Sequence, residues 1–444
     1  MANIQGGAKR RFGKQLSYSA SVTALFLGAF VAPAQAQEAG AQFASAEDII
    51  VTGSRRSSTV QESSINIAAV SAEKIESLGL ANLTDASRSV PGIYVLDQGA
   101  RGSARVIVRG LNADGLGSAE GIENDGGGTV ATYVGEIPLF VNLKLNDMER
   151  VEYLFGPQGT LYGAGTLGGA IRYIPTKPKF DAATASIRSD FYSYSEGHGI
   201  SGEGGITVNQ PITDTFAIRA SVDRVDDNGF IDYDYAVRQP GVSNPDPDFS
   251  DPADVAANIN PVRDANFEET WSGRVAARWA PNDIFDATLT YYFQDQDVGA
   301  RQISSRRSIL STGKYVSNQR VTEPSNNKND LIALETITNL VFADLTVAAG
   351  YSRYKEKGSR DQTDLLIGLE YSYEAFPNFT AFTREDEKDT TTTFEPRLVS
   401  KLDGPLQFIA GAFYNRFNGW SQSLEFTPGY AQYNGINRPD NLEY

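Results

Sequence analysis

The chain has 444 residues, no cysteine and a single histidine, His198. Without cysteine it can form no disulfide and offers no thiolate nucleophile or metal ligand. One histidine disfavours a zinc site built from imidazoles and a Ser-His-Asp triad. We interpret His198, in "SEGHGIS", as an exposed turn residue. Carboxylates for hydrolase chemistry cannot be paired from the sequence, so we expect no enzyme, no cofactor and no metal centre.

Positive charge and long apolar runs are also scarce. The formal net charge is −16, which disfavours nucleic-acid binding because such proteins carry basic stripes. One apolar run, Tyr18–Val31, follows a basic start and precedes the small residues of "APAQAQ". This order predicts a secretory signal peptide over residues 1–36. No comparable run follows, so a helical membrane protein is disfavoured.

Aromatic residues and glycine are abundant, with 21 Tyr, 23 Phe and 42 Gly. From about residue 179 to 444 the apolar residues alternate with polar ones. In "WSGRVAARW", for example, Trp271, Val275 and Trp279 share one face while Arg274 and Arg278 share the other. This period of two predicts β-strands. An exported, aromatic-rich, alternating chain of weak mean hydropathy is typical of outer-membrane β-proteins.

Short turns and long polar loops alternate between these strands. "PITDT", "APND", "FAD" and "LDGP" read as tight turns, and two polar stretches of more than thirty residues separate other strands. This arrangement favours an antiparallel transmembrane β-barrel over a soluble β-sandwich. We count about ten strands and expect one of them to run through "PLQFIAGAFY", residues 405–414.

One long loop is rich in aspartate. Its carboxylates could bind Ca²⁺, or they could form a solvated loop. Their spacing matches no EF-hand and prolines interrupt it, which favours the solvated loop. The residues are Asp232, Asp234, Asp246, Asp248, Asp251 and Asp254.

Residues 59–178 have a different pattern, that of a compact α+β domain of about 120 residues. A helix is predicted from an N-cap at Ser71 to Gly79. Strands are predicted over residues 92–96, 104–110, 130–139 and 148–155.

A glycine-rich stretch follows the last of these strands. Gly163, Gly165 and Gly168 have the G-x-G-x-x-G spacing of a dinucleotide-binding turn. Such a turn requires a helix directly after it. Here "GAIRYIPTKP" alternates like a strand and contains Pro175 and Pro178. We therefore reject a phosphate site and interpret the glycines as a structural hinge.

Residues 37–58 are rich in Ala, Gln and Ser, which predicts a flexible segment. It contains the island "EDIIVTGSRR", Glu47–Arg56. The island can be the first strand of the following domain, or an extended peptide that adds to the sheet edge of a partner.

Three segments resemble the TonB-dependent outer-membrane receptors. "DIIVTG" resembles their TonB box, "ARVIVRGL" (104–111) a plug strand ending in Arg-Gly, and residues 148–178 the end of the plug. The resemblance implies an α+β plug followed by an antiparallel transmembrane β-barrel. It assigns TonB binding to Asp48, Ile49, Ile50, Val51, Thr52 and Gly53. It assigns a plug structural motif to Arg109, Gly110, Glu149, Arg150, Glu152, Gly156, Pro157, Gly159, Gly168 and Gly169.

The chain departs from the family in two respects. The family usually has arginine before Gly-Pro, where this chain has Phe155, so Glu149 and Glu152 must find other cations. About ten strands also contrast with about 22 in plugged transporters, and about ten strands could not enclose such a plug. From this difference we expect a chain truncated at its C-terminus that lacks about half of the barrel.

The resemblance implies TonB-dependent import of a scarce ligand across the bacterial outer membrane. The ligand could be a siderophore complex of iron, cobalamin, a saccharide or an aromatic compound. The expected partners are TonB with its inner-membrane energising complex, outer-membrane lipid and the small-molecule ligand. Ligand contacts are expected at the plug apex from Arg101, Ser103, Asn112, Asp114, Asn124 and Asp125. The alternatives are a passive porin-like or signalling barrel and a secreted soluble β-rich carbohydrate-active protein.

Overall fold

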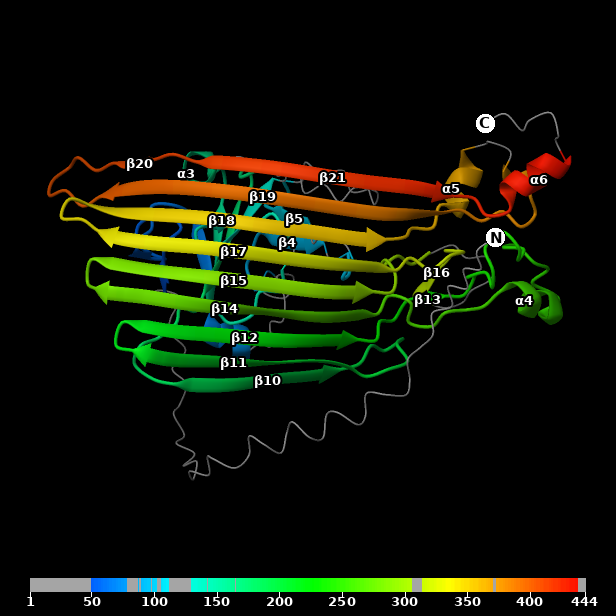
Figure 1. Ribbon diagram of the computed structural model, residues 1–444, viewed down its shortest axis with the longest axis horizontal. Helices are drawn as coiled ribbons and strands as arrows, with labels where there is room; N and C mark the ends of the chain where they lie inside the picture. Colours follow the sequence, from blue (N-terminus) through cyan, green and yellow to red (C-terminus); the bar gives the residue numbers. More distant parts are fainter. Residues whose placement is uncertain are drawn as a thin grey trace, which may run out of the picture. The chain divides into compact units, whose positions relative to one another are not determined.

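Strands dominate the computed structural model, which describes residues 49–77, 87, 89–96, 98–101, 105–111, 129–141, 143–163, 165–305, 314–369 and 373–437 (Figure 1). They form one ten-stranded sheet, one five-stranded sheet and three two-stranded sheets. None of the helices in the described ranges combines the length and the apolar character needed to cross a membrane. The mostly β fold predicted from the alternation is confirmed.

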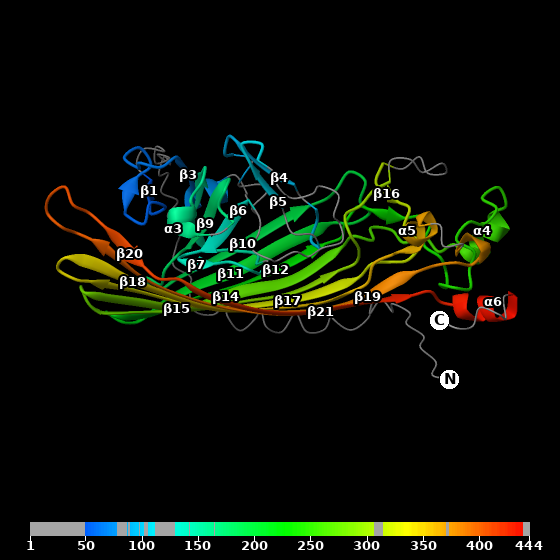
Figure 2. The ribbon, with the colours of Figure 1, turned by 90° about the horizontal axis from the view of Figure 1, so that it is seen from above.

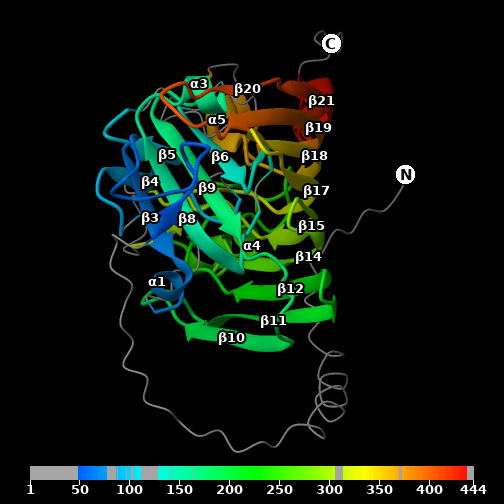
Figure 3. The same cartoon turned by 90° about the vertical axis from the view of Figure 1, so that its left-hand side faces the viewer.

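The five-stranded sheet has the order β3-β8-β9-β6-β7. Figure 3 shows β3, β8, β9 and β6 of this sheet. Its strands are β3 (Ile67–Ser71), β6 (Val130–Val134), β7 (Ile137–Pro138), β8 (Met148–Phe155) and β9 (Gly169–Pro175). Around it lie β1 (Ile50–Val51) paired with β2 (Ser58–Thr59), β4 (Ile93–Leu96) paired with β5 (Arg105–Val108), and the helices α1 (Ala72–Ser77) and α3 (Gly159–Tyr162). We call these elements together the plug region.

Both faces of this sheet are covered, which explains why its central strand β8 is buried at every residue except Glu149. Tyr153 and Ile171 contribute to one buried cluster, whereas their chain neighbours Leu154 and Ala170 contribute to another. Successive side chains of a strand point to opposite faces, so β8 and β9 must supply both clusters. The helix predicted after Ser71 is present, and Ser71 Oγ accepts a hydrogen bond from the backbone of Lys74 at 3.4 Å.

The strand predicted over residues 130–139 is wrong, because this segment forms a hairpin of β6 and β7. Gly135 lies between them with φ of 58°, a left-handed conformation that breaks the extended chain. Its N–H donates to the carbonyl of Tyr173 on β9 at 2.7 Å, which fixes the turn beside the neighbouring strand. The turn places Glu136 at the tip of the hairpin.

The stretch after the glycine-rich segment is extended, as predicted. Residues Gly169–Pro175 form β9, and α3 precedes rather than follows Gly163 and Gly165. Gly169 has φ of 150°, and a Cβ there would lie 2.0 Å from the carbonyl oxygen of Leu154. Glycine is therefore required here to let β9 approach β8.

The ten-stranded sheet is antiparallel between all neighbours, in the order β10-β11-β12-β14-β15-β17-β18-β19, with β20 and β21 both paired to β19. Its strands are β10 (Thr184–Tyr192), β11 (Ser201–Thr213), β12 (Phe216–Asp227), β14 (Glu268–Asn282), β15 (Phe285–Val298), β17 (Ser325–Asn339), β18 (Ala343–Gly358), β19 (Phe382–Ser400), β20 (Ile409–Gly411) and β21 (Tyr414–Phe426). We call this sheet the wall.

The single strand predicted within residues 405–414 is wrong in its continuity. β20 and β21 follow one another along β19, interrupted at residues 412 and 413. The same register places this interruption opposite Glu395 and Pro396. Proline has no N–H, so a ladder bond is missing there, although the N–H of Ala412 still donates to the Pro396 carbonyl at 3.1 Å.

Short turns and long connections lie at opposite ends of the wall (Figure 1). Long connections lie at one end, which we call the loop end; their described residues are 228–267, 299–305, 314–324, 359–369 and 373–381. They contain β13 (Asp232–Tyr233), α4 (Pro252–Asn258), β16 (Val316–Ser317), α5 (Thr363–Gly368) and η1 (Tyr373–Ala375), and α6 (Tyr430–Asn437) follows β21 at the same end. The opposite turn end has two-residue turns such as 214–215 and 283–284.

The wall is curved (Figure 2). Its two faces differ in polarity. On β14, Trp271, Val275 and Trp279 are about half exposed, at 51%, 48% and 50%. Their neighbours Thr270 and Arg274 are buried. An apolar outer face and a polar inner face are the pattern of a strand between lipid and a protein-filled interior.

The β6–β7 hairpin packs against the inner face of the wall. Val134 and Ile137 share a buried cluster with Leu331 and Ala348 of the wall. Gly350 makes room for this contact, because a Cβ there would lie 2.6 Å from Cγ2 of Ile137. The hairpin therefore forms an apolar contact between the plug region and the wall.

Candidate functional site

The predicted TonB-box segment lies at the edge of the plug region. Asp48 is outside the described residues, and Ile50 and Val51 form β1. Ile50 is 58% exposed, whereas Val51 is 1% exposed and packs with Ile67 and Leu154. The segment thus presents one apolar side chain to solvent and buries the next.

Polar contacts also hold this segment. The Thr52 N–H donates to Oε1 of Glu152 at 2.9 Å. The hydroxyl of Tyr162 donates to the Gly53 carbonyl at 2.7 Å, and Nη1 of Arg172 donates to Oγ1 of Thr52 at 2.8 Å. The box is therefore the first strand of the plug region in this structure, and a partner strand could use it only along its free edge.

The predicted plug motif surrounds a buried carboxylate. Glu152 is 0% exposed and accepts from Nε of Arg150 at 2.9 Å and from Nη1 of Arg172 at 2.7 Å. Glu149 pairs with Arg150. The expectation that both glutamates find cations other than a residue at position 155 is confirmed. Phe155 instead packs below the guanidinium of Arg109, 5.1 Å from its ring centre.

The remaining motif residues shape the chain around these pairs. Arg109 and Gly110 follow β5, both with positive φ. After β8 the chain turns at Gly156 and Pro157, enters α3 at Gly159 and returns to β9 through Gly168 and Gly169.

Glu136, at the tip of the β6–β7 hairpin, joins the plug region to the wall. Its carboxylate pairs with Arg55, with Arg172 at 2.7 Å and with Arg397 of β19 at 2.6 Å. Burial alone would raise the pKa of Glu136, but the three guanidinium groups outweigh burial and hold its pKa well below the usual range. Glu136 is therefore an anionic centre among three cations.

Asp147 forms a second ionic contact with the wall. Its carboxylate accepts from Arg219 of β12 at 2.5 and 2.7 Å and from Arg274 of β14 at 2.6 Å. All three side chains are largely buried, at 7%, 13% and 3% exposure. The contact clamps the chain just before β8 to two wall strands.

We predict that Asp147→Asn lowers the opening free energy of the plug region by about 2 kcal/mol, since two buried guanidinium groups lose a charged partner. Asparagine tolerates the φ of 61° at this position, so the backbone is retained. Amide hydrogen exchange of β8 and β9 measures the effect. Asp295→Asn removes a carboxylate from an exposed pair with Lys328 and serves as control. Equal exchange in the two variants contradicts the clamp.

Arg101 is the one predicted ligand contact that lies in the described part of the chain; Ser103, Asn112, Asp114, Asn124 and Asp125 lie outside it. Its side chain is 6% exposed. Nη1 donates to the carbonyls of Glu323 and Ser359, both at 2.7 Å, and Nη2 donates to Glu385 at 3.2 Å. The hydrogen bonds of the Arg101 guanidinium therefore attach the plug region to the loop end of the wall.

Glu323 connects several loops at this end. It is 0% exposed and accepts from the Tyr233 hydroxyl at 2.7 Å, from Nε of Arg301 at 3.1 Å and from the backbone of Asp361 at 2.9 Å. Burial acts to raise the pKa of Glu323, but the hydrogen bonds and charge of Arg301 outweigh it and lower the pKa. The Glu323 carboxylate therefore joins the three long connections, and the backbone carbonyl of the same residue accepts from Arg101.

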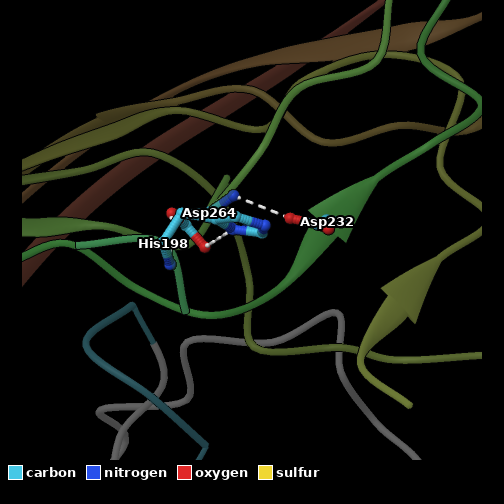
Figure 4. Close-up of side chains that lie close together, drawn as sticks. All are labelled: His198, Asp232 and Asp264. Carbon is cyan, nitrogen blue, oxygen red and sulfur yellow. Dashed lines mark hydrogen bonds and ion pairs between the residues drawn. The ribbon is translucent and has the colours of Figure 1, made fainter. Parts of the chain in front are cut away.

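His198 lies close to two carboxylates of the loop end (Figure 4). Its Nδ1 is 3.1 Å from Oδ1 of Asp264, and its backbone N–H donates to Oδ2 at 3.1 Å. Asp232 accepts from the Asp264 backbone at 3.0 Å and pairs with Arg263. Every carboxylate oxygen of Asp232 and Asp264 has a partner. The contacts of His198 with Asp264 therefore connect residues 193–200 with residues 228–267.

The aspartate-rich loop uses its carboxylates internally. Asp251 caps α4 by accepting from the Ala253 backbone at 2.9 Å, Asp254 accepts from the Asp248 backbone at 2.8 Å, and Asp246 pairs with Arg320 at 2.9 Å. Asp234 lies 3.3 Å from Arg263. The sequence favoured a solvated loop, and the structure shows that hydrogen bonds within the loop and a pair with Arg320 also hold these carboxylates.

Comparison with known proteins identifies the plug region. Residues 59–170 match the family model of the TonB-dependent Receptor Plug Domain. This part of the chain is a plug domain of the TonB-dependent receptor type. A plug domain beside a sheet with an apolar outer face makes the chain an outer-membrane protein.

Two curated TonB-dependent receptors illustrate the relationship. The vitamin B12 transporter BtuB of Vibrio vulnificus is 32% identical over 133 residues, which are 29% of this chain and 21% of BtuB. The catecholate siderophore receptor Fiu of Escherichia coli K12 is 29% identical over 170 residues, which are 37% of this chain and 20% of Fiu. The matched segments therefore cover about a fifth of each relative.

Solved structures share the fold of this chain. The ferric yersiniabactin uptake receptor FyuA from Yersinia pestis has a TM-score of 0.58 and 17% identity, covering 82% of this chain and 50% of FyuA. The ferric citrate transporter FecA has a TM-score of 0.60 and 12% identity, covering 83% of this chain and 49% of FecA. The chain spans about half the length of these receptors.

Glu136, Arg172 and Asp147 were not predicted as functional residues of this receptor. A signal for Arg172 was available, because it is a charged residue between Ile171 and Tyr173 in an otherwise apolar strand. Glu136 and Asp147 occur in turns, where charged residues are ordinary, and their partners are distant in sequence. Only the fold reveals their role.

Proposed function

We propose that this receptor imports a scarce ligand across the outer membrane by TonB-driven movement of its plug. The observation that carries the proposal is the position of the box segment. Ile50 is exposed on a two-residue strand, and Arg56, three residues past Gly53, donates to the Ser400 carbonyl at the turn end of the wall at 2.9 Å. A partner in the periplasm could reach the segment there and pull on the buried contacts of Glu152.

The proposed partner is TonB with its inner-membrane energising complex. Adding a strand to β1 requires only main-chain hydrogen bonds, which a short extended peptide supplies. Glu152 and Glu136 share Arg172, and Glu136 pairs with Arg397, so ionic contacts run from the box to the wall. Asp147 forms a separate ionic contact with the wall. Force on the box would be transmitted to the plug through these contacts. The box residues and domain boundaries given above, with a plug over 59–178 and the barrel from 179, are part of this proposal.

The curated relatives supply the first ligands to test. BtuB is a vitamin B12 transporter and Fiu a catecholate siderophore receptor. Cyanocobalamin, a ferric catecholate and maltose should be supplied in labelled form to cells that carry the receptor, with and without TonB. We expect one of them to accumulate only when TonB is present. Accumulation that does not depend on TonB would contradict active import and favour the passive porin-like alternative.

A further inference from the structure

A cavity of about 150 Å³ opens at the loop end of the wall, beside the Glu323 contacts. Arg301 and Gln319 from residues 299–324 line it, together with Arg360, Asp361, Gln362 and Asp364 from residues 359–381. It is smaller than the roughly 300–1,000 Å³ of pockets that enclose a whole drug-sized ligand. A cavity of this size accommodates one ring-sized part of a ligand.

Two arginines and two aspartates line the cavity. Both arginines already pair with carboxylates, Arg301 with Glu323 and Arg360 with Glu385, so a net anion would find no unpaired cation there. A net cation would lie beside two guanidinium groups. The Asp361 carboxylate is already hydrogen-bonded within the protein, because it accepts from the backbone N–H of Val321 at 3.0 Å and of Thr363 at 2.8 Å. The lining therefore favours an uncharged ligand.

The lining also offers both donors and acceptors. Within the described ranges, Nη1 of Arg301 and the side-chain amide of Gln362 have no hydrogen-bond partner, and the Asp364 side chain is 59% exposed with its nearest guanidinium atom at 3.9 Å. Gln319 makes one long contact, 3.4 Å to Glu323. A hydroxyl group both donates and accepts, so it can satisfy every one of these groups.

Two carboxylates connect this cavity with the plug. Glu323 binds Arg301 of the cavity through its side chain and Arg101 of the plug region through its carbonyl. Glu385 binds Arg360 of the cavity through Oε1 and Arg101 through Oε2 at 3.2 Å. A shift of either cavity arginine therefore changes a contact of Arg101.

We infer that this cavity binds an uncharged, hydroxyl-rich part of the ligand, such as a sugar ring, and that Arg101 transmits its occupancy to the plug. The inference rests on the proposed import function and names the chemical class of its cargo. The ligand ring would displace solvent from Gln319 and Gln362 and draw on the free nitrogen of Arg301. The plug would respond at residues 98–101 and 105–108, which flank Arg101.

Calorimetric titration of the purified receptor in detergent tests the ligand class. The neutral probes are glucose, maltose, maltotriose and xylobiose, and the charged probes are citrate and putrescine. We expect at least one neutral probe to bind and Gln362→Ala to weaken it about five- to tenfold, as the loss of one to two hydrogen bonds implies. Gln210→Ala, on an exposed glutamine near the turn end, is the matched control and should leave the affinity unchanged. Failure of all neutral probes, or binding of a charged probe that depends on Gln362, overturns the inference.

Hydrogen exchange at saturating sugar tests transmission to the plug. Sugar should change protection of residues 98–101 and 105–108 in the wild-type receptor and leave it unchanged in Arg101→Gln. An identical response in both proteins overturns the role of Arg101. TonB-dependent accumulation of a charged ligand alone would refute the sugar class and leave import standing. Sugar binding with TonB-independent accumulation would refute import instead.

Discussion

Replacing Glu136 with glutamine is expected to lower the opening free energy of the plug by about 3 kcal/mol, the largest effect on stability that we predict. Glu136 is the common partner of Arg55, Arg172 and Arg397. Glutamine keeps the shape of the side chain but removes its charge, so three buried guanidinium groups lose their counter-ion. Amide exchange of β6 to β9 measures the change.

The same residue predicts a pH dependence. A carboxyl whose pKa is lower in the folded state contributes stability above its unfolded pKa of about 4.3 and loses it as the pH falls toward the folded value. The pKa of Glu136 is lowered in this way. The opening free energy of the plug should therefore differ most between the wild type and Glu136→Gln at pH 7. This difference should become progressively smaller below about pH 4.

Glu269→Gln is the matched control for this variant. Glu269 pairs with Arg224 at 2.6 Å, but its side chain is 51% exposed, and exposed pairs contribute about 0–1 kcal/mol. If Glu136→Gln lowers the opening free energy of the plug no more than Glu269→Gln does, the contact between Glu136 and the wall does not hold the plug. A difference between wild type and variant that is constant with pH would contradict the role of its charge.

Local pattern was sufficient to predict most of the fold. Alternation identified the wall because one face is apolar and the other polar, and β14 shows this contrast between Trp271 and Arg274. β8 was predicted with its exact bounds, since "MERVEYLF" is flanked by turn residues. Where the local pattern was ambiguous, the predictions failed. Gly135 turned one predicted strand into a hairpin, and Pro396 on a neighbouring strand interrupted another.

The site could be predicted only in its local parts. The box segment was predicted from consecutive residues, but its burial depends on Glu152 and Tyr162, about a hundred residues away. Arg101 was predicted to contact ligand, and this stays a prediction. Its guanidinium contacts Glu323 and Glu385, which are more than two hundred residues distant. No periodicity in the sequence carries information about such pairings.

These long-range contacts give the plug an attachment at each end of the wall. Arg101 holds the loop end, Glu136 and Asp147 hold the interior, and Arg56 reaches Ser400 at the turn end. Each of these contacts except the one at Arg56 is largely buried. Movement of the plug away from the wall would therefore separate buried ion pairs, and leaving one partner of such a pair buried without the other is strongly unfavourable.

Ile50→Pro is expected to reduce the affinity of the receptor for the periplasmic domain of TonB at least tenfold without changing the stability of the plug. The pairing of β1 with β2 explains this separation of effects. The N–H of Val60 donates to the Ile49 carbonyl, and Val51 lies opposite Ser58 in the same ladder. Hydrogen-bonded and non-bonded pairs alternate in an antiparallel ladder, so the N–H of Ile50 points away from β2.

A strand of TonB that adds to this free edge needs the Ile50 N–H, which proline lacks. Ile50→Ala keeps the N–H and is the control, because it removes only an exposed side chain. Val51→Pro provides the opposite case, since it removes a bond to β2 beside a side chain that is 1% exposed, and it should destabilise the plug as well. Surface-immobilised TonB domain gives the affinities and amide exchange gives the stability. If Ile50→Pro bound the TonB domain as tightly as the wild type, strand addition at β1 would be excluded. A strand that adds to this edge must accept a hydrogen bond from the Ile50 N–H, and the variant has no such N–H.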